Sequence, residues 1–383
     1  MASSCFSKVK IAGISAVVPS SEIRLEDELE FFGGDIKKAN RVTQIVGINK
    51  RRIAERGVTA ADLCQQAAEN MLFGMGIDKA SIDALIFVSQ TPDYKLPATA
   101  CILQHKLGLS NACAAFDVNQ GCAGYTYGLW LAASLVESGA CKRVLLLVGE
   151  SLSRVIDRDN RIIVPLFGDC GTATLIEKSD AGHPSWFELG TDGSEHEALI
   201  VPAGQSRLPL PDSPEEYAAL CERIVDGNGT PWRLIRTYMD GEAVFDFTMS
   251  VVPKHIAALL ESAGKSADDI DYLVLHKANK QIVTAVAARA GFPEEKAPYS
   301  TFSEFGNLAG ASIPAVICHL LAEKVCNGEL NLLLSGYGVG LSWASAVLKL
   351  DRIWCSGMRD YVRPEGHQNP DDILAYWQEK LSE

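Results

Sequence analysis

Cys122 has the sequence surroundings of a reactive thiol. It follows Gly121 in the segment 119–126, between a predicted short strand and a predicted long helix. Glycine permits a tight turn at this point, and the unpaired N–H groups and dipole of a helix N-terminus stabilise an anion. Because the thiolate is the nucleophilic form of cysteine, the sequence predicts a Cys122 thiol of lowered pKa at the start of a helix.

A histidine, an asparagine and a glycine-rich turn complete a candidate catalytic set. His276 ends a predicted strand at 272–275, and α/β folds place their chemistry at the carboxyl ends of strands. Asn307 opens another predicted helix. The turn at 336–340 contains three glycines and is suited to present backbone N–H groups to a developing oxyanion.

The elements that must position these residues alternate between β-branched runs and amphipathic helical stretches, which indicates an α/β fold. Strands are predicted at 84–89, 116–118, 143–148, 272–275, 331–335 and 343–350, and helices at 98–107, 122–138, 280–289 and 309–325.

The second half of the chain repeats the first. Segments 82–88, 121–124 and 145–149 resemble 270–276, 306–310 and 332–336, in the same order and at offsets of 185 to 188 residues. The repeat makes Asn307 the counterpart of Cys122. It predicts two halves, 1–180 and 181–351, an insertion at 202–240 and a C-terminal tail at 352–383 that ends in a helix.

Composition excludes several classes of protein. The 383 residues carry 35 Lys and Arg against 48 Asp and Glu, a net charge of −13, which argues against nucleic acid and anionic membranes as partners. The early apolar stretch 9–18 is too short and broken for a signal peptide, and no segment approaches the roughly 20 apolar residues that span a bilayer. The eleven cysteines include no Cys-x-x-Cys pair, so we expect a reduced, cytoplasmic protein without structural zinc.

The segments 120–128, 276–279 and 306–314, with the final glycine-rich strand, resemble the β-ketoacyl-acyl-carrier-protein synthase III family of the thiolase superfamily. The resemblance covers roughly residues 8–351. It implies a duplicated five-layer αβαβα thiolase-like fold, a homodimer, and substrates carried on coenzyme A (CoA) or on an acyl carrier protein. It also implies decarboxylative Claisen condensation without a metal or redox cofactor.

The family match assigns roles to individual residues. Cys122 would hold the acyl group as a thioester, and the backbone N–H groups of Cys122 and Gly340 would bind the oxyanion. His276 Nε2 and the Asn307 amide would donate hydrogen bonds to the enolate. Leu96 matches an aromatic residue that gates the acyl pocket across the dimer, which predicts room for a longer or bulkier acyl chain.

The residues that grip CoA in the family are replaced here. Arg41 and Ile45 occupy the positions of a Trp and an Arg that hold the adenine, just before the pair Gly47-Ile48. The acyl donor is therefore expected on a carrier protein, or on CoA held in another way.

An acidic carrier protein needs a basic surface on a chain of this net charge. We expect that surface at Lys277 and Lys280, beside the candidate catalytic histidine. The alternative is the run 50–52 with Arg56.

Four other functions match part of the pattern. An acyltransferase that passes the acyl group from Cys122 to a hydroxyl or an amine is disfavoured by the presence of Asn307. A hydroxymethylglutaryl-CoA synthase-like reaction needs a carboxylate base, for which the loop 91–99 offers only Asp93. A non-catalytic partner subunit of a synthase would not need the three catalytic residues. A hydrolase at Ser151 lacks the second glycine of a nucleophile elbow.

Overall fold

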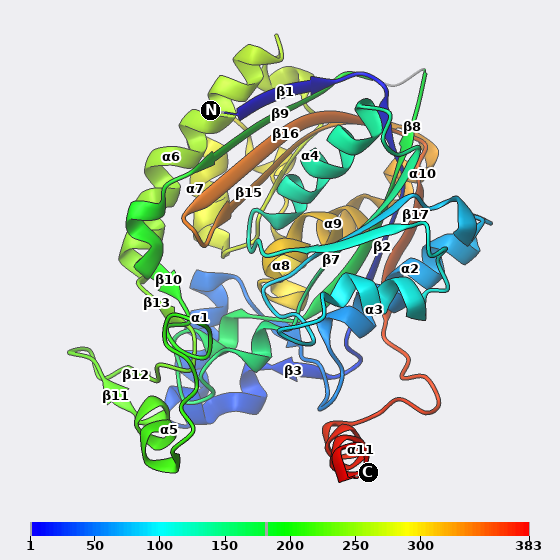
Figure 1. The fold of residues 1–383 in the computed structure, drawn as a ribbon. Coiled ribbons are helices and arrows are strands. Elements are labelled where there is room, and N and C mark those ends of the chain that lie inside the picture. The colour runs from blue at the N-terminus through cyan, green and yellow to red at the C-terminus, as the bar shows by residue number, and fades with distance from the viewer. Residues whose placement is uncertain (1, 181–182, 383) are drawn as a thin grey trace.

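Two β-sheets with the same strand order form the frame of the protein (Figure 1). The computed structural model describes residues 2–180 and 183–382. The first sheet runs, in spatial order, through β17 (Trp354–Asp360), β2 (Val9–Val18), β8 (Cys170–Lys178), β7 (Arg143–Glu150), β5 (Ala84–Val88) and β6 (Ala114–Val118). The second runs through β1 (Ala2–Phe6), β9 (Ser185–Thr191), β16 (Ser342–Asp351), β15 (Glu329–Gly338) and β14 (Tyr272–Leu275).

Helices separate and cover the two sheets (Figure 1). Between the sheets lie α4 (Gly124–Glu137) and a helical run made of η8 (Ala309–Ala311), α9 (Ser312–Val316), the π-helical turn η9 (Ile317–Leu321) and α10 (Ala322–Asn327). The outer faces carry α2 (Ala60–Gly74) and α3 (Thr99–Lys106) on the first sheet, and α6 (Gly241–Ser262) and α7 (Lys280–Arg289) on the second. The predicted five-layer αβαβα fold is confirmed.

Each of the two terminal strands belongs to the sheet of the opposite half of the chain. β1 pairs antiparallel with β9 in the second sheet, and β17 pairs parallel with β2 in the first sheet. Residues 354–360 therefore belong to the sheet of the first half, although they follow the second repeat in the sequence. The division into halves near residue 180 otherwise stays a prediction.

The central helix α4 is apolar because it is enclosed from both sides. Tyr125, Leu129 and Ala132 are at most 3% exposed, and a helix buried all round reads as apolar on every face. At Gly128 a Cβ atom would lie 2.7 Å from the side chain of Leu146 in β7, so glycine allows the close approach of helix and strand.

The remaining elements lie around the site-bearing edge of the sheets or connect the layers. They are β3 (Glu22–Arg24), η1 (Leu25–Phe32), α1 (Ile36–Val46), β4 (Lys50–Arg52), η2 (Lys79–Ser81), η3 (Leu152–Arg154), η4 (Val164–Leu166), η5 (Gly193–Ala198), β10 (Leu199–Ile200), α5 (Pro214–Cys221), β11 (Ile224–Val225), β12 (Pro231–Trp232), β13 (Tyr238–Met239), η6 (Ala267–Asp269), η7 (Glu294–Lys296), α8 (Ser300–Phe305) and α11 (Pro370–Ser382).

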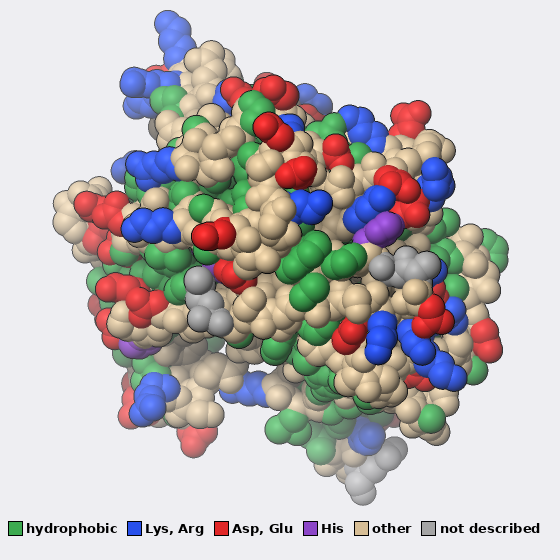
Figure 2. Space-filling model, turned by 90° about the horizontal axis from the view of Figure 1, so that it is seen from above, with side chains coloured by type: hydrophobic (Ala, Val, Ile, Leu, Met, Phe, Trp, Pro, Cys, Tyr) green, Lys and Arg blue, Asp and Glu red, His purple; other side chains and the backbone are tan. Residues whose placement is uncertain are grey.

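Two helical stretches are long and apolar enough to cross a membrane by composition alone. They are α6 and the run 309–327, whose most apolar windows are 50% and 67% buried inside the protein. Their apolar residues pack against the sheets, as expected of core helices. On the face shown in Figure 2, acidic and basic side chains are interspersed, so no large field of one sign covers this side.

Candidate active site

The three predicted catalytic residues line one cavity of about 240 Å³. Cys122 comes from the turn before α4, His276 from the end of β14, and Asn307 from the turn before the central helical run. Their exposed fractions are 7%, 3% and 6%. The fold thus brings Cys122 of the first half together with His276 and Asn307 of the second half in one enclosed site.

Cys122 lies two residues before the first residue of α4, in a tightly packed turn. A Cβ on Gly338 would lie 2.7 Å from the Cys122 sulfur, so this neighbour has to be glycine. Burial raises the pKa of the Cys122 thiol to about 11, although backbone N–H groups of Val339 and of Cys122 itself act in the opposite direction. The expectation of a lowered pKa is therefore wrong for the free protein: desolvation outweighs the helix terminus.

The imidazole of His276 is held in one orientation. Its Nδ1 lies 3.2 Å from the carbonyl oxygen of Ala309, and because a carbonyl can only accept, Nδ1 carries the proton. Burial, with a smaller contribution from the charge of Lys277, lowers the pKa of His276 to about 4, although the hydrogen bond to Ala309 acts in the opposite direction. The ring is therefore neutral at pH 7, with Nε2 free to accept a proton.

Asn307 is fixed by its own turn. Its Oδ1 accepts a hydrogen bond of 2.9 Å from the backbone N–H of Ala309, and its backbone N–H donates to the carbonyl of Leu166 at 2.7 Å. Ala309 has a φ of 44°, a left-handed conformation that turns both of its backbone groups toward the catalytic side chains. With Oδ1 occupied, the amide N–H₂ group of Asn307 remains as a donor.

A second backbone donor beside the Cys122 thiol is Val339. The N–H of Val339 acts on the Cys122 thiol, and both Gly338 and Val339 line the cavity. A Cβ on Gly340 would instead meet Ser342, which lies toward β16. Gly340 was assigned by the family match, which does not reveal the direction of each N–H group, and its role at the oxyanion stays a prediction.

Most of the remaining cavity wall is apolar and comes mainly from two segments that the catalytic motifs do not include, 152–167 and 199–244. The wall includes Leu152, Val155, Ile156, Leu166, Phe167, Leu199, Met239, Val244 and Ile282. The predicted insertion is joined to the segment 152–164 by Arg233, which contacts Asp157 and Asp159 at 2.5 and 2.6 Å. The insertion thereby helps to form an apolar pocket suited to an acyl chain.

Leu96, the predicted gate, lies on the loop between β5 and α3 and is 81% exposed. Within the described residues of this one chain it does not line the cavity. Its role was predicted for the pocket of a partner subunit and stays a prediction.

Glu150 and Gln90 are two polar residues near the thiol that sequence reasoning missed. Glu150 ends β7, is fully buried, and accepts hydrogen bonds from the N–H of Gln90 and the hydroxyl of Thr91. Burial raises the pKa of Glu150 to about 8. Gln90 lines the cavity with Cys122. Their positions in the sequence could have revealed them, since Glu150 ends one buried parallel strand and Gln90 follows its neighbour at the same sheet edge.

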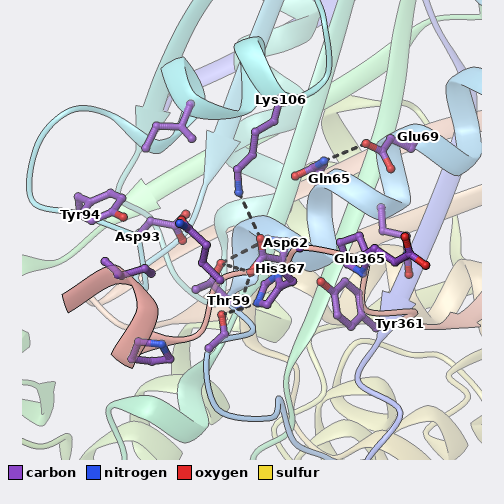
Figure 3. Close-up of a pocket in the computed structure, with 18 residues that line it drawn as sticks. Thr59, Asp62, Gln65, Glu69, Asp93, Tyr94, Lys106, Tyr361, Glu365 and His367 are labelled. Atoms are coloured by element: carbon purple, nitrogen blue, oxygen red, sulfur yellow. Dashed lines mark hydrogen bonds and ion pairs between the residues drawn. The ribbon is translucent and has the colours of Figure 1, made fainter. Parts of the chain in front are cut away.

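Asp93, the carboxylate considered for a hydroxymethylglutaryl-CoA synthase-like reaction, lies in a different cavity (Figure 3). This cavity of about 730 Å³ lies between α2, α3 and the C-terminal segment, and none of the three catalytic residues lines it. Burial raises the pKa of Asp93. Asp93 does not line the cavity that holds Cys122.

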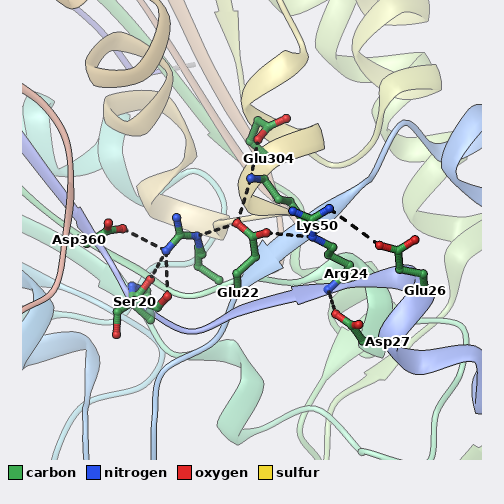
Figure 4. A network of polar contacts seen from close by, with 10 residues as sticks. Ser20, Glu22, Arg24, Glu26, Asp27, Lys50, Glu304 and Asp360 are labelled. Atoms are coloured by element: carbon green, nitrogen blue, oxygen red, sulfur yellow. Dashed lines mark hydrogen bonds and ion pairs between the residues drawn. The ribbon is translucent and has the colours of Figure 1, made fainter.

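Neither of the two basic surfaces predicted for carrier docking presents its full positive charge at the protein surface. Lys277 is 1% exposed, and its Nζ donates to the carbonyl of Pro298 at 2.5 Å. In the alternative run, Arg51 forms a bidentate pair with Glu28. The other members are paired with acids: Lys50 with Glu22 and Glu304, Arg52 with Glu22 and Asp360, and Arg56 with Asp371 (Figure 4 shows the network around Lys50). Burial removes Lys277 from the surface and pairing neutralises the alternative run, whereas Lys280 is partly exposed and forms no ion pair with a described residue.

Comparisons with known proteins agree with the geometry. Residues 116–193 match the family 3-oxoacyl-[acyl-carrier-protein (ACP)] synthase III, and residues 260–350 match its C-terminal family. A β-ketoacyl-[acyl-carrier-protein] synthase III of Streptococcus equi subsp. zooepidemicus is 36% identical over 81% of this chain and 90% of its own. The chain belongs to the 3-oxoacyl-ACP synthase III family.

Solved structures of synthase III relatives share the fold. A 3-oxoacyl-(acyl-carrier protein) synthase from Burkholderia xenovorans LB400 superposes with a TM-score of 0.86, at 38% identity over 94% of this chain and 99% of its own. A priming β-ketosynthase of the R1128 polyketide pathway superposes with a TM-score of 0.74, at 27% identity over 90% of this chain and 97% of its own. This synthase III-like protein is thus a condensing enzyme that acts on acyl thioesters.

Proposed function

We propose that this synthase III-like enzyme loads an acyl group on Cys122 and condenses it with a malonyl-type thioester, with loss of CO₂. The observation that carries the proposal is the shared cavity, in which a thiol, a neutral imidazole, an oriented amide donor and two backbone N–H groups meet. We further propose that the enzyme is cytoplasmic and serves fatty acid or polyketide synthesis.

In the acylation step, Cys122 Sγ attacks the thioester carbonyl while its proton moves to His276 Nε2. The N–H groups of Cys122 and Val339 bind the resulting oxyanion. Collapse of the intermediate breaks the bond to the leaving thiolate, which takes the proton back from Nε2. The site therefore needs no permanently ionised thiol, in keeping with the raised pKa of Cys122.

In the condensation step, the malonyl carboxylate leaves as CO₂ and its bonding electrons form an enolate. The N–H₂ group of Asn307 donates to the enolate oxygen. The enolate carbon attacks the acyl thioester on Cys122 and expels the thiolate, which takes up a proton from solvent and returns to the thiol. A neutral His276 whose proton lies on Nδ1 cannot donate from Nε2, so this proposal revises the role expected for the histidine.

We also propose that the enzyme is a homodimer formed through β6. Within the described part of the chain, β6 pairs only with β5, so one of its edges is open. An open edge strand is a template for pairing with another chain. Such pairing would lie next to Cys122, which follows β6, and would bring Leu96 of one protomer toward the other.

The carrier protein is proposed to dock on α1 and the start of α7. The carrier patch consists of Lys37, Lys38, Arg41 and Lys280. Side chains of the three α1 residues are exposed and form no ion pair with a described residue. Helices α1 and α7 are in contact, and the side chain of Lys280 lies against Gly47 at the end of α1. Since Ile282 of α7 lines the cavity, the patch adjoins its mouth.

Intact-protein mass spectrometry tests the proposal. Wild-type protein incubated with a panel of acyl-CoA and acyl-carrier thioesters should gain the mass of one acyl group, and adding malonyl thioester should discharge it with release of CO₂. Cys122→Ala should gain no acyl mass, whereas Cys326→Ala, which changes an exposed cysteine, should load normally. Loading without discharge, followed by transfer to an added alcohol or amine, would favour the acyltransferase alternative.

A further inference from the structure

Lys277 is a buried cation that the reaction above does not use. It directly follows His276 and belongs to the largest side chains that are almost fully buried. Its only hydrogen bond in the described structure is the one from Nζ to the carbonyl of Pro298. Within residues 2–180 and 183–382, no carboxylate lies within 4.0 Å of it. Buried lysines normally have a carboxylate partner, so this exception needs an explanation.

The side chains of His276 and Lys277 point in different directions. The imidazole of His276 points to Ala309 in the layer between the sheets, whereas the ammonium of Lys277 reaches Pro298, which precedes α8. Successive residues of an extended chain point to opposite sides. Lys277 therefore lies behind the strand end that carries the imidazole, and its one hydrogen bond keeps it there.

In acid, Lys277 is the charged neighbour of the His276 imidazole, because the other titratable groups around the ring are neutral there. The Tyr337 ring meets it edge-on at 5.6 Å and Cys122 shares its cavity. Burial raises the pKa of both, so both are neutral below pH 8. Glu150, whose pKa is about 8, is also neutral in acid. On the far side of Lys277, the Nζ of Lys280 lies over the Tyr299 ring at 4.8 Å.

We propose that Lys277 is a positioning residue that keeps His276 in its neutral, proton-accepting form. Repulsion from a fixed ammonium disfavours the imidazolium, so Nε2 stays available to Cys122 at lower pH than it otherwise would. The proposal rests on the acylation step above. Burial lowers the pKa of Lys277 itself to about 7, so this repulsion is strongest below neutrality, where a histidine titrates.

The pH dependence of single-turnover acylation with a small neutral acyl thioester, measured from pH 4 to 8, tests the proposal. The wild-type rate should fall in acid with a midpoint well below 6.5, the ordinary pKa of histidine. In Lys277→Met, which keeps much of the volume but removes the charge, the midpoint should rise by about half a unit to one unit. Lys277→Arg, which keeps a charge, should restore the wild-type midpoint.

Lys296→Met is the matched control. Lys296 also donates to backbone carbonyls, those of Ala267 and Ile270, but lies outside the cavity. Its variant should keep the wild-type midpoint. An unchanged midpoint in Lys277→Met would overturn the proposal. So would a wild-type midpoint at or above 6.5, a result that needs no variant to fold. Failure of the wild type to load any thioester would refute the proposed function instead.

Discussion

The imidazole of His276 and the carboxamide of Asn307 are oriented by the backbone of one residue, Ala309. Its carbonyl accepts from His276 Nδ1, and its N–H donates to Asn307 Oδ1. The left-handed residue Ala309 therefore leaves His276 as a proton acceptor and Asn307 as a hydrogen-bond donor toward the cavity. The two side chains come from different elements, yet their chemical roles are set together.

This arrangement predicts different defects for the two residues. Asn307→Ala should load an acyl group at nearly the wild-type rate but release CO₂ from malonyl thioester about 10²-fold more slowly, because one enolate donor is worth about 3 kcal/mol. His276→Ala should lose loading by about 10²-fold or more, since a general base is removed. Both rates can be followed with labelled acyl and malonyl thioesters.

Exposed residues provide the controls for this pair. Asn228→Ala, on the insertion, and His196→Ala, near the start of β10, should leave both half-reactions unchanged. Equal loss of loading and CO₂ release in Asn307→Ala would contradict the division of roles.

The sequence predicted the strand at 272–275 and the helix at 280–289 with the bounds that the structure shows. Both are enclosed elements whose apolar pattern is set by local periodicity. The catalytic residues were recognisable for a related reason: each occupies a short connecting segment just before a helical element, and glycine and polar residues mark such segments in the sequence.

Features that depend on distant neighbours were not predictable in this way. Lys277 appears as a surface charge in sequence, but the direction of its side chain follows from the end of β14 and from Pro298. The thiol pKa of Cys122 depends on burial by elements of both halves. The backbone N–H of the turn 336–340 that points at the Cys122 thiol depends on how this turn packs against the turn before α4. Tertiary contacts decide all three.

The carrier patch makes a prediction about charge. Reversal of Lys37, Lys38 and Arg41 to glutamate should raise KM for an acyl carrier thioester at least about tenfold, because an acidic carrier would be repelled. KM for a small neutral thioester should hardly change. The wild-type KM for the carrier substrate should rise with salt, as the Debye length shortens from about 8 Å at physiological ionic strength to about 3 Å at 1 M.

Lys8 and Lys142 offer a control for net charge, which their reversal changes by −4 against −6 for the three residues of α1. Their backbone carbonyls accept from residues that follow β8, at the sheet end opposite to Glu150. Reversal of both to glutamate changes the net charge without altering the carrier patch, and should leave the carrier KM close to that of the wild type. A similar rise in both sets of variants would show that total charge matters and that α1 is not the docking site.

The last prediction concerns the buried pair of Glu150 and Cys122. The charge of Glu150 raises the pKa of the thiol, and burial raises the pKa of Glu150 itself to about 8. The carboxyl is neutral below pH 8 and charged above it, so its effect on the thiol appears only in alkali. In Glu150→Gln, iodoacetamide should therefore alkylate Cys122 faster than in wild type at pH 9.5, but at the same rate at pH 7. Peptide mass mapping reports the rate at this one cysteine.

Glu188→Gln changes a buried carboxylate in the other sheet and should match wild type at both pH values. Equal rates for Glu150→Gln and wild type at pH 9.5 would mean that the carboxyl does not control the thiol.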